Sequence, residues 1–174
     1  EKLPDVLHTG FPMLDEASDI ECGSLTFWAG WPSNGKSSVL RYLIHQFMQT
    51  HPDLFTFYVC TDDDPRKAHI HMLSIMMKAR KRELEASIKD GTFTQRPEIS
   101  NRWDDIHETL RNRICIMGYS DCYSLAMIRK RIEQLRAVKK NVPFLVIVDA
   151  INDLTDLSTD KQREGIETVI RELK

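Results

Sequence analysis

The chain has 174 residues, of which 41% are hydrophobic and 29% charged, and its formal net charge is −2. This length suits one domain with a sizeable core, and the near-neutral charge excludes a global basic field that would attract nucleic acid. No apolar run approaches the length of a membrane span and no leader resembles a signal peptide, so we expect a soluble protein without a membrane partner.

The first strand-like run, Leu25–Ala29, leads into the most informative segment of the chain. Residues Gly30 to Ser37 read Gly-Trp-Pro-Ser-Asn-Gly-Lys-Ser and fit the phosphate-loop pattern G-x-x-x-x-G-K-[ST]. Apolar residues at helical spacing follow over Lys36–Gln49. The glycines let backbone N–H groups wrap around a phosphate, and the helix adds the positive end of its dipole. This order of strand, loop and helix predicts a binding site for ATP.

The loop side chains have separate expected roles. Lys36 would reach the β- and γ-phosphate oxygens, and Ser37 would offer its hydroxyl to Mg²⁺. The other residues expected to bind the nucleotide are Gly30, Pro32, Ser33, Asn34, Gly35 and Ser38. The alternative is an ordinary glycine-containing turn between a strand and a helix, but the pattern arises by chance only about once in a hundred chains of this length.

The second strand-like run, Phe55–Cys60, is followed by three acidic residues. Asp64 precedes Pro65, and helices favour Asp at the N-cap and Pro at the first position, so we expect Asp64 to be structural. Asp62 or Asp63 is then free to orient or deprotonate the water that attacks the γ-phosphate. The residues also leave open a solvated acidic turn.

Further elements follow in the chain. We expect a loop or a pair of turns over Lys89–Ser100, a helix through Trp103, Ile106 and Leu110, a strand over Arg113–Met117, a helix from Ser124 through Leu135, and a strand over Phe144–Val148. The last run is uniformly apolar, which is typical of a parallel strand covered on both faces. Strands that alternate with helices predict an α/β fold, a doubly wound and mainly parallel sheet flanked by helices.

Asp149 ends the last apolar run as Phe-Leu-Val-Ile-Val-Asp, which is the Walker B pattern. Ligands of open parallel sheets sit beyond the carboxyl ends of the strands, so we expect Asp149, the phosphate loop and the acidic run to converge on one crevice. There Asp149 would support the magnesium ion through its water shell. A carboxylate that caps a turn is the alternative.

Two basic residues, the cysteines and the chain ends also carry expectations. Lys161 and Arg163 follow the Walker B strand in a polar loop, where they would suit contact with a nucleic-acid strand in a ring pore. The scattered cysteines, without C-x-x-C spacing, indicate a reducing cytoplasm. The chain starts at Glu1 rather than Met and stops at Lys174 inside a helical pattern, so we expect a piece of a longer protein.

An ordered set of short segments is similar to a known family. The set comprises Thr9-Gly10-Phe11, Leu14-Asp15, Gly23, the loop from Pro32 to Ser38, Cys60-Thr61-Asp62 with His71-Met72-Leu73, Ile147-Val148-Asp149, and Arg163 with Arg171-Glu-Leu-Lys174. Over roughly His8 to Lys174, the chain resembles the RecA-like ATPase domain of DnaB-type replicative DNA helicases. Many ATPases share the phosphate loop, so the order of the whole set makes the resemblance specific.

The resemblance implies a RecA-like P-loop NTPase core over residues 1–174. This core would be incomplete, because the family's sensor strand, arginine finger and second DNA loop would lie beyond the end of the chain. A match without gaps puts Asp62 at the position of the family's catalytic Glu, whereas a match by Pro65 puts Asp63 there. An Asp is one methylene shorter than a Glu, and this difference bears on the rate of hydrolysis.

The resemblance also implies a function. The chain would be an ATP-hydrolysing motor domain that acts with Mg²⁺ in a homo-oligomeric ring, a hexamer, and couples hydrolysis to movement on single-stranded DNA, with replication or loading proteins as partners. A RecA-like switch ATPase, whose nucleotide state controls protein assembly without unwinding, is the alternative. A third hypothesis, a module that binds nucleotide only structurally, is disfavoured by the intact Lys36, Ser37 and Asp149.

Overall fold

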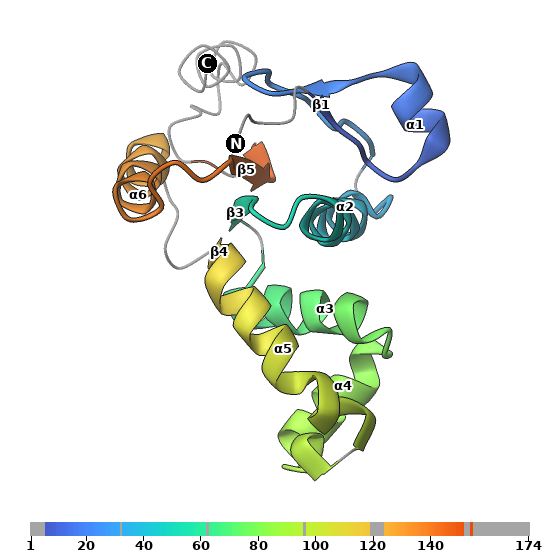
Figure 1. The fold of residues 1–174 in the computed structure, drawn as a ribbon. Helices are drawn as coiled ribbons and strands as arrows, with labels where there is room; N and C mark the ends of the chain where they lie inside the picture. Colours follow the sequence, from blue (N-terminus) through green and yellow to red (C-terminus); the bar gives the residue numbers. More distant parts are fainter. Residues whose placement is uncertain are drawn as a thin grey trace.

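Three parallel strands form the centre of the structure, with helices on both sides of them (Figure 1). The computed structural model describes residues 6–31, 33–61, 63–95, 97–118, 124–151 and 154, with the side chains at 94 and 98–101 excepted. In chain order the elements are β1 (Val6–Leu7), α1 (Pro12–Ala17), β2 (Ile20–Glu21), α2 (Lys36–Thr50), β3 (Phe55–Cys60), α3 (Pro65–Met77), α4 (Lys81–Lys89), η1 (Phe93–Gln95), α5 (Pro97–Arg113), β4 (Ile114–Met117), α6 (Leu125–Val138) and β5 (Phe144–Asp149).

The central strand of the sheet is β3, which lies between β4 and β5 and runs parallel to both. All six of its residues are buried, as expected for a strand covered on both faces. Phe57 and Val59 pack against α6. Tyr58 and Cys60 pack on the opposite face, among residues of α2, α3 and α5 (Figure 1). The structure therefore confirms the predicted α/β class, with a parallel sheet flanked by helices.

Helix α2 starts at Lys36, within the last two residues of the phosphate-loop pattern. Gly35 is its N-cap and has a φ of 77°, a left-handed conformation that favours glycine. The end of α2 and the turn after it are held by Arg113, which donates from Nη1 to the Met48 oxygen at 2.8 Å and from Nη2 to the oxygen of Leu54, beyond the helix, at 3.5 Å. The predicted helix over Lys36–Gln49 is confirmed, and it extends one residue further.

Helix α3 begins as the sequence predicts. The Asp64 side chain caps it by accepting a hydrogen bond from the Arg66 N–H at 2.7 Å, and Pro65 occupies the first helical position. Gly118, at the end of β4, lies against this helix start. A Cβ atom at Gly118 would be 2.0 Å from Pro65 Cγ, so only glycine fits. The start of α3 is thus fixed against the carboxyl end of the sheet.

The prediction of a buried strand over Leu25–Ala29 is wrong. Residues 24–31 have no regular secondary structure, and the side chains of Phe27 and Trp28 are 51% and 36% exposed. An extended segment becomes a stable strand only when a neighbour takes up its backbone hydrogen bonds. The two sides of β3 are taken by β4 and β5, and no described strand pairs with residues 24–31.

The loop predicted over Lys89–Ser100 is also wrong in part. Lys89 still belongs to α4, a 3₁₀ turn spans Phe93–Gln95, and α5 already begins at Pro97. Proline suits this first position because its fixed φ is helical and no N–H is needed there. The Phe93 ring packs edge-on against Trp103 of α5, with ring centroids 4.8 Å apart. At its other end α5 continues through Arg113, so β4 begins one residue later than predicted. Among the described residues, no helix has the length and apolar character that crossing a bilayer needs.

Candidate nucleotide-binding site

The Lys36 side chain forms hydrogen bonds with the main chain of the phosphate loop. The Lys36 ammonium donates to the main-chain oxygens of Gly30 at 2.8 Å and of Trp31 at 3.0 Å. The Asn34 N–H donates to the Trp31 oxygen at 3.3 Å, and Ser33 has a φ of 63°. Among the residues that the structure describes, the partners of this cation are therefore carbonyl oxygens, which phosphate oxygens can replace.

The loop is open to solvent. Trp31 is 80% exposed, whereas Lys36 and Ser37 are half-buried at the first turn of α2. The predicted nucleotide-binding residues with exposed positions are Gly30, Ser33, Asn34, Gly35 and Ser38. Pro32 lies outside the described residues. An anion can thus approach the first N–H groups of α2, which have no partner within the helix.

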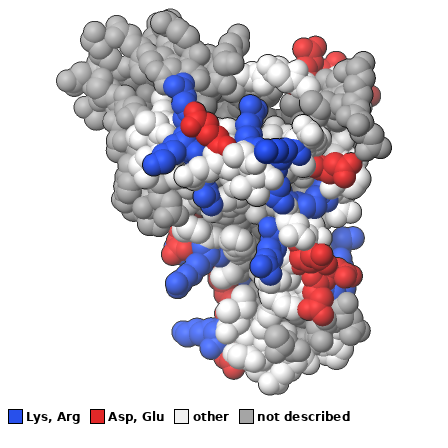
Figure 2. Space-filling view, turned by 60° about the vertical axis from the view of Figure 1, so that its left-hand side comes forward, with Lys and Arg blue, Asp and Glu red and all other residues white. Residues whose placement is uncertain are grey.

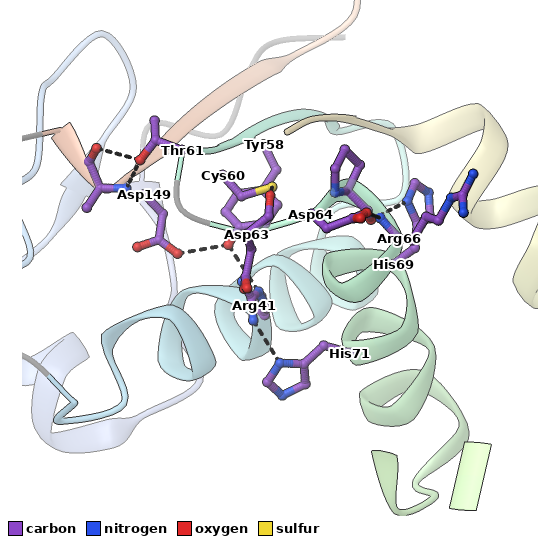
Figure 3. Close-up of polar contacts among 12 residues, drawn as sticks. Arg41, Tyr58, Cys60, Thr61, Asp63, Asp64, Arg66, His69, His71 and Asp149 are labelled. Atoms are coloured by element: carbon purple, nitrogen blue, oxygen red, sulfur yellow. Dashed lines mark hydrogen bonds and ion pairs between the residues drawn. The ribbon is translucent and has the colours of Figure 1, made fainter. Parts of the chain in front are cut away.

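Asp149 lies where the sequence predicts it, at the carboxyl end of β5. It is 4% exposed, and its Oδ2 accepts a hydrogen bond from the Tyr58 hydroxyl at 2.8 Å (Figure 3). Thr61 connects the ends of β3 and β5. Its N–H donates to the main-chain oxygen of Asp149 at 2.7 Å, and its hydroxyl accepts from the Ala150 N–H at 2.8 Å. The backbone that carries Asp149 is therefore fixed by the neighbouring strand.

The acidic residues after β3 have different partners in the structure. Asp64 caps α3, as predicted. Asp63 is 34% exposed and forms an ion pair with Arg41 of α2 (Figure 3). Asp62 lies outside the described residues. Of the two carboxylates that the sequence left open as water-orienting groups, Asp63 thus has one oxygen occupied by a guanidinium, so it is not a freely solvated acidic turn.

A polar network, which we call the Arg41 network, comprises Arg41, Tyr58, Asp63, His71 and Asp149. Arg41, Tyr58 and Asp149 are buried, and the other two members are half-buried. The Arg41 Nε donates to the Tyr58 hydroxyl at 3.0 Å, its Nη1 donates to His71 Nδ1 at 2.9 Å, and its Nη2 donates to Asp63 Oδ2. Figure 3 shows the guanidinium on α2 between Asp63 and the His71 ring on α3, with Asp149 on the other side of Tyr58.

Sequence reasoning gave no role to Arg41, Tyr58 or His71, although His71 belongs to one of the segments that carry the resemblance. One signal was present: Arg41 lies three residues before Ile44 and seven before Met48, which is the spacing of the buried face of α2. A charged residue on an apolar face needs a partner of opposite charge. The identity of that partner follows only from the fold.

The protonation states of this network follow from its burial. Burial raises the pKa of the Tyr58 hydroxyl; Arg41 opposes this rise and Asp149 adds to it. Burial lowers the pKa of His71, Arg41 and Lys81 lower it further, and Asp63 opposes them. At neutral pH, Tyr58 is therefore a neutral hydroxyl and His71 a neutral imidazole that accepts from Arg41 through Nδ1.

The segment that opens the resemblance forms a local turn. The Asp15 carboxylate accepts from the Thr9 N–H at 2.7 Å, from the Thr9 hydroxyl at 2.8 Å and from the Gly10 N–H at 3.1 Å. The hydrogen bonds from the Thr9 hydroxyl and then from its N–H are the main causes that lower the pKa of Asp15. These residues therefore stabilise the chain before β2 and lie outside the Arg41 network.

Two of the predicted residues carry oxygen donors of the kind that a magnesium ion prefers. Ser37 offers a hydroxyl oxygen, and Asp149 Oδ1 has no hydrogen-bond partner among the described residues (Figure 3). Hard oxygen donors of this kind, completed by water and phosphate oxygens, are what Mg²⁺ prefers. Within the described part of the chain, no three His, Cys, Asp or Glu side chains form a cluster that could hold a metal on their own.

Basic side chains gather on the face formed by α6, with acidic side chains between them (Figure 2). Those on α6 and the turn after it are Arg129, Lys130, Arg131, Arg136, Lys139 and Lys140. Most are exposed, as a solvated helix face requires. Lys161 and Arg163, the residues predicted to contact nucleic acid, lie outside the described residues.

Fold and site together define an α/β protein with a parallel sheet, helices on both faces, and a phosphate-loop sequence at the start of α2. Comparisons of the chain with protein-family models, with curated proteins and with solved structures found no match.

Proposed function

We propose that this chain is an ATP-binding and ATP-hydrolysing domain. The observation that carries the proposal is the position of the Lys36 ammonium, which lies over the phosphate loop with main-chain carbonyls as its partners. It is supported by the buried Asp149 carboxylate at the end of β5. One cation that is free to exchange partners and one fixed carboxylate are the charges that a magnesium-bound triphosphate requires.

Different residues would bind the phosphates and the magnesium ion. Lys36 exchanges its carbonyl partners for β- and γ-phosphate oxygens, and the N–H groups after Gly35 receive the phosphate. The Ser37 hydroxyl and Asp149 hold the magnesium ion, directly and through water. When bound, this ion neutralises charge on the phosphates. Phosphoryl transfer depends mostly on such positioning and charge stabilisation, so little covalent chemistry is required of the protein.

The wider proposal is a motor domain that acts in a homo-oligomeric ring and moves on single-stranded DNA. It rests on the resemblance to DnaB-type helicase domains. One observation favours the switch ATPase as the second candidate: Asp63 is paired with Arg41, which leaves fewer carboxylates to orient water. A slow ATPase suits a switch better than a motor.

Titration of the full chain with ATP in the presence of magnesium tests the nucleotide proposal. Trp31 is 80% exposed and lies inside the loop, so its fluorescence reports on ligand entry, with calorimetry as an independent measurement. We expect Lys36→Ala to weaken binding at least about 100-fold, the loss of a charge-assisted phosphate contact. The matched control is Lys130→Ala, at an exposed position on α6. Equal affinity in both variants, or no binding to the parent at millimolar ATP, would overturn the proposal.

A second measurement separates motor from switch. The ATPase rate of the full-length protein, in a verified oligomer, is compared with and without single-stranded DNA. A motor predicts stimulation of about tenfold or more, because a finger residue supplied by a neighbouring subunit acts in the engaged ring. An unchanged rate supports the switch.

A further inference from the structure

The Arg41 guanidinium connects residues at the carboxyl ends of β3 and β5. Arg41 is 4% exposed, and it lies five residues after Lys36 on the same helix. A buried guanidinium is costly unless acceptors surround it, and here all three of its nitrogens donate. Two of the acceptors lead to carboxylates: Asp63 directly, and Asp149 through the Tyr58 hydroxyl.

The direction of these hydrogen bonds is fixed by chemistry. An arginine only donates, so the Tyr58 oxygen must accept from Nε. The single hydroxyl hydrogen of Tyr58 is then available to Asp149 Oδ2, 2.8 Å away. For the same reason His71 accepts through Nδ1 and carries its own proton on Nε2. Each of the three Arg41 nitrogens therefore has one acceptor, and the Tyr58 hydroxyl donates its own hydrogen to Asp149.

The two carboxylate oxygens of Asp149 differ in their surroundings, since one is hydrogen-bonded within the protein and the other is available to a ligand. Oδ2 is held by Tyr58, which is fully buried and cannot move without disturbing Arg41. Oδ1 has no hydrogen-bond partner among the described residues. Within the Arg41 network, one positive charge faces the carboxylates of Asp63 and Asp149, so the network has a net charge of −1. A divalent cation next to Asp149 is thus favoured by geometry and by charge.

We propose that Arg41 and Tyr58 are positioning residues that orient Asp149 toward the magnesium ion of bound ATP, and that Asp63 is the counterion of Arg41 rather than the group that orients water. This inference rests on the proposed function, because it assigns these residues a task toward the same nucleotide. It goes beyond that function by naming the residues behind the metal-supporting carboxylate. Of the two carboxylates that the sequence left open for orienting water, it leaves Asp62 as the candidate.

The test is the magnesium dependence of ATP binding in Tyr58→Phe. This change removes one hydroxyl and keeps the ring. Residues behind a metal ligand commonly change metal affinity by about 10-fold to 100-fold, so we expect the magnesium concentration at half-maximal binding to rise at least about 10-fold. Affinity for ATP without magnesium should change less than about twofold, since the phosphate loop is untouched. Tyr42→Phe, at an exposed tyrosine of α2, is the matched control.

Arg41→Lys is a second variant, since it keeps the positive charge but not the three directed contacts. It should raise the magnesium midpoint in the same way, and the double variant should be no worse than the worse single one. Thermal unfolding establishes that each variant is folded. An unchanged midpoint in a folded variant, with binding intact in the parent, overturns this inference alone. A parent protein that binds no ATP with magnesium removes the proposed function and, with it, this inference.

Discussion

Lys36 and Arg41 lie five residues apart on the same helix, yet their surroundings are opposite. Lys36 is half-buried, and its ammonium donates to main-chain carbonyls of an open loop. Arg41 is 4% exposed and donates to three side chains from β3, from the segment after it and from α3. The first cation can exchange its partners for a ligand, whereas the second cannot leave its partners without exposing buried polar groups.

This contrast separates two tasks that positive charges perform near a phosphate site. Hydrogen bonds from a lysine to exposed carbonyls have a small net free energy, because water replaces them easily. Removing a buried arginine has a large cost, because its acceptors are left buried without a donor. We therefore expect substitutions in the Arg41 network to change the free energy of unfolding, and substitutions in the loop to change ligand affinity.

The largest loss of stability should come from Arg41→Met. This variant removes the guanidinium and leaves the Tyr58 oxygen and His71 Nδ1 without a donor, so we expect about 3 kcal/mol of destabilisation. Urea unfolding followed by circular dichroism measures it. Arg82→Met, at an exposed position of α4, should change stability by less than about 0.5 kcal/mol. A similar loss in both variants would show that the buried contacts of Arg41 are not what stabilises the fold.

Gly118→Ala should have the next largest effect, because it tests the packing beside the network. The added Cβ would lie 2.0 Å from Pro65 Cγ and 2.9 Å from the Pro65 nitrogen, so β4 or α3 must shift. Overpacking of this kind costs about 1–3 kcal/mol. The double variant with Pro65→Ala should recover part of the loss, because the Cγ and Cδ contacts disappear. Additive losses in the double variant would contradict this steric origin.

Most of the fold was predictable where the signal is local. The Asp64 cap of α3 was read from two adjacent residues, and it is confirmed. The Ser124 cap of α6 is confirmed as well, with its hydroxyl 3.3 Å from the Met127 N–H. The apolar runs predicted both β3 and β5 as strands, and β3 is buried throughout as expected for a strand covered on both faces. The expected burial of β5 is not met, because Phe144–Val148 are half-buried in a strand that pairs on one side only among the described residues. Each of these signals depends on residues that are neighbours in the sequence.

The failures concern contacts between distant residues. Leu25–Ala29 has the composition of a strand, but a strand also needs a neighbour, and composition does not say whether one is there. The partners of Arg41 lie 17 residues away at Tyr58 and 30 residues away at His71, and no motif connects them. Sequence therefore gives the phosphate loop and Asp149 of the candidate site, whereas the residues that hold Asp149 in place follow only from the fold.

A smaller effect should appear in the pH dependence of stability, through His71. Its pKa is lowered in the folded protein, so the unfolded chain binds the proton more readily and acid favours unfolding. The stability contribution is complete above 6.5, the ordinary pKa value, and is lost as the pH falls through the lowered pKa. The groups that face the ring are Arg41, Lys81 and Asp63.

Urea unfolding at several pH values between about 5 and 8 tests this contribution, since carboxylates titrate mostly below that range. We expect the loss of stability on acidification to be smaller in His71→Gln than in the parent. It should not vanish, because burial also lowers the pKa of His45 and His51. An identical pH profile in His71→Gln would mean that the imidazole does not exchange a proton on unfolding.

The smallest change in stability should be that of Lys36→Ala, the same variant that is expected to lose nucleotide affinity. Its two hydrogen bonds go to carbonyls of an exposed loop, and water can replace both. We expect the free energy of unfolding to change by less than about 0.5 kcal/mol. Unfolding in urea without nucleotide measures this, and a repeat with saturating ATP and magnesium should stabilise the parent but not the variant, because only a bound ligand shifts the equilibrium. If Lys36→Ala were as destabilising as Arg41→Met, the lysine would be part of the folded framework, and its availability to a phosphate would have to be abandoned.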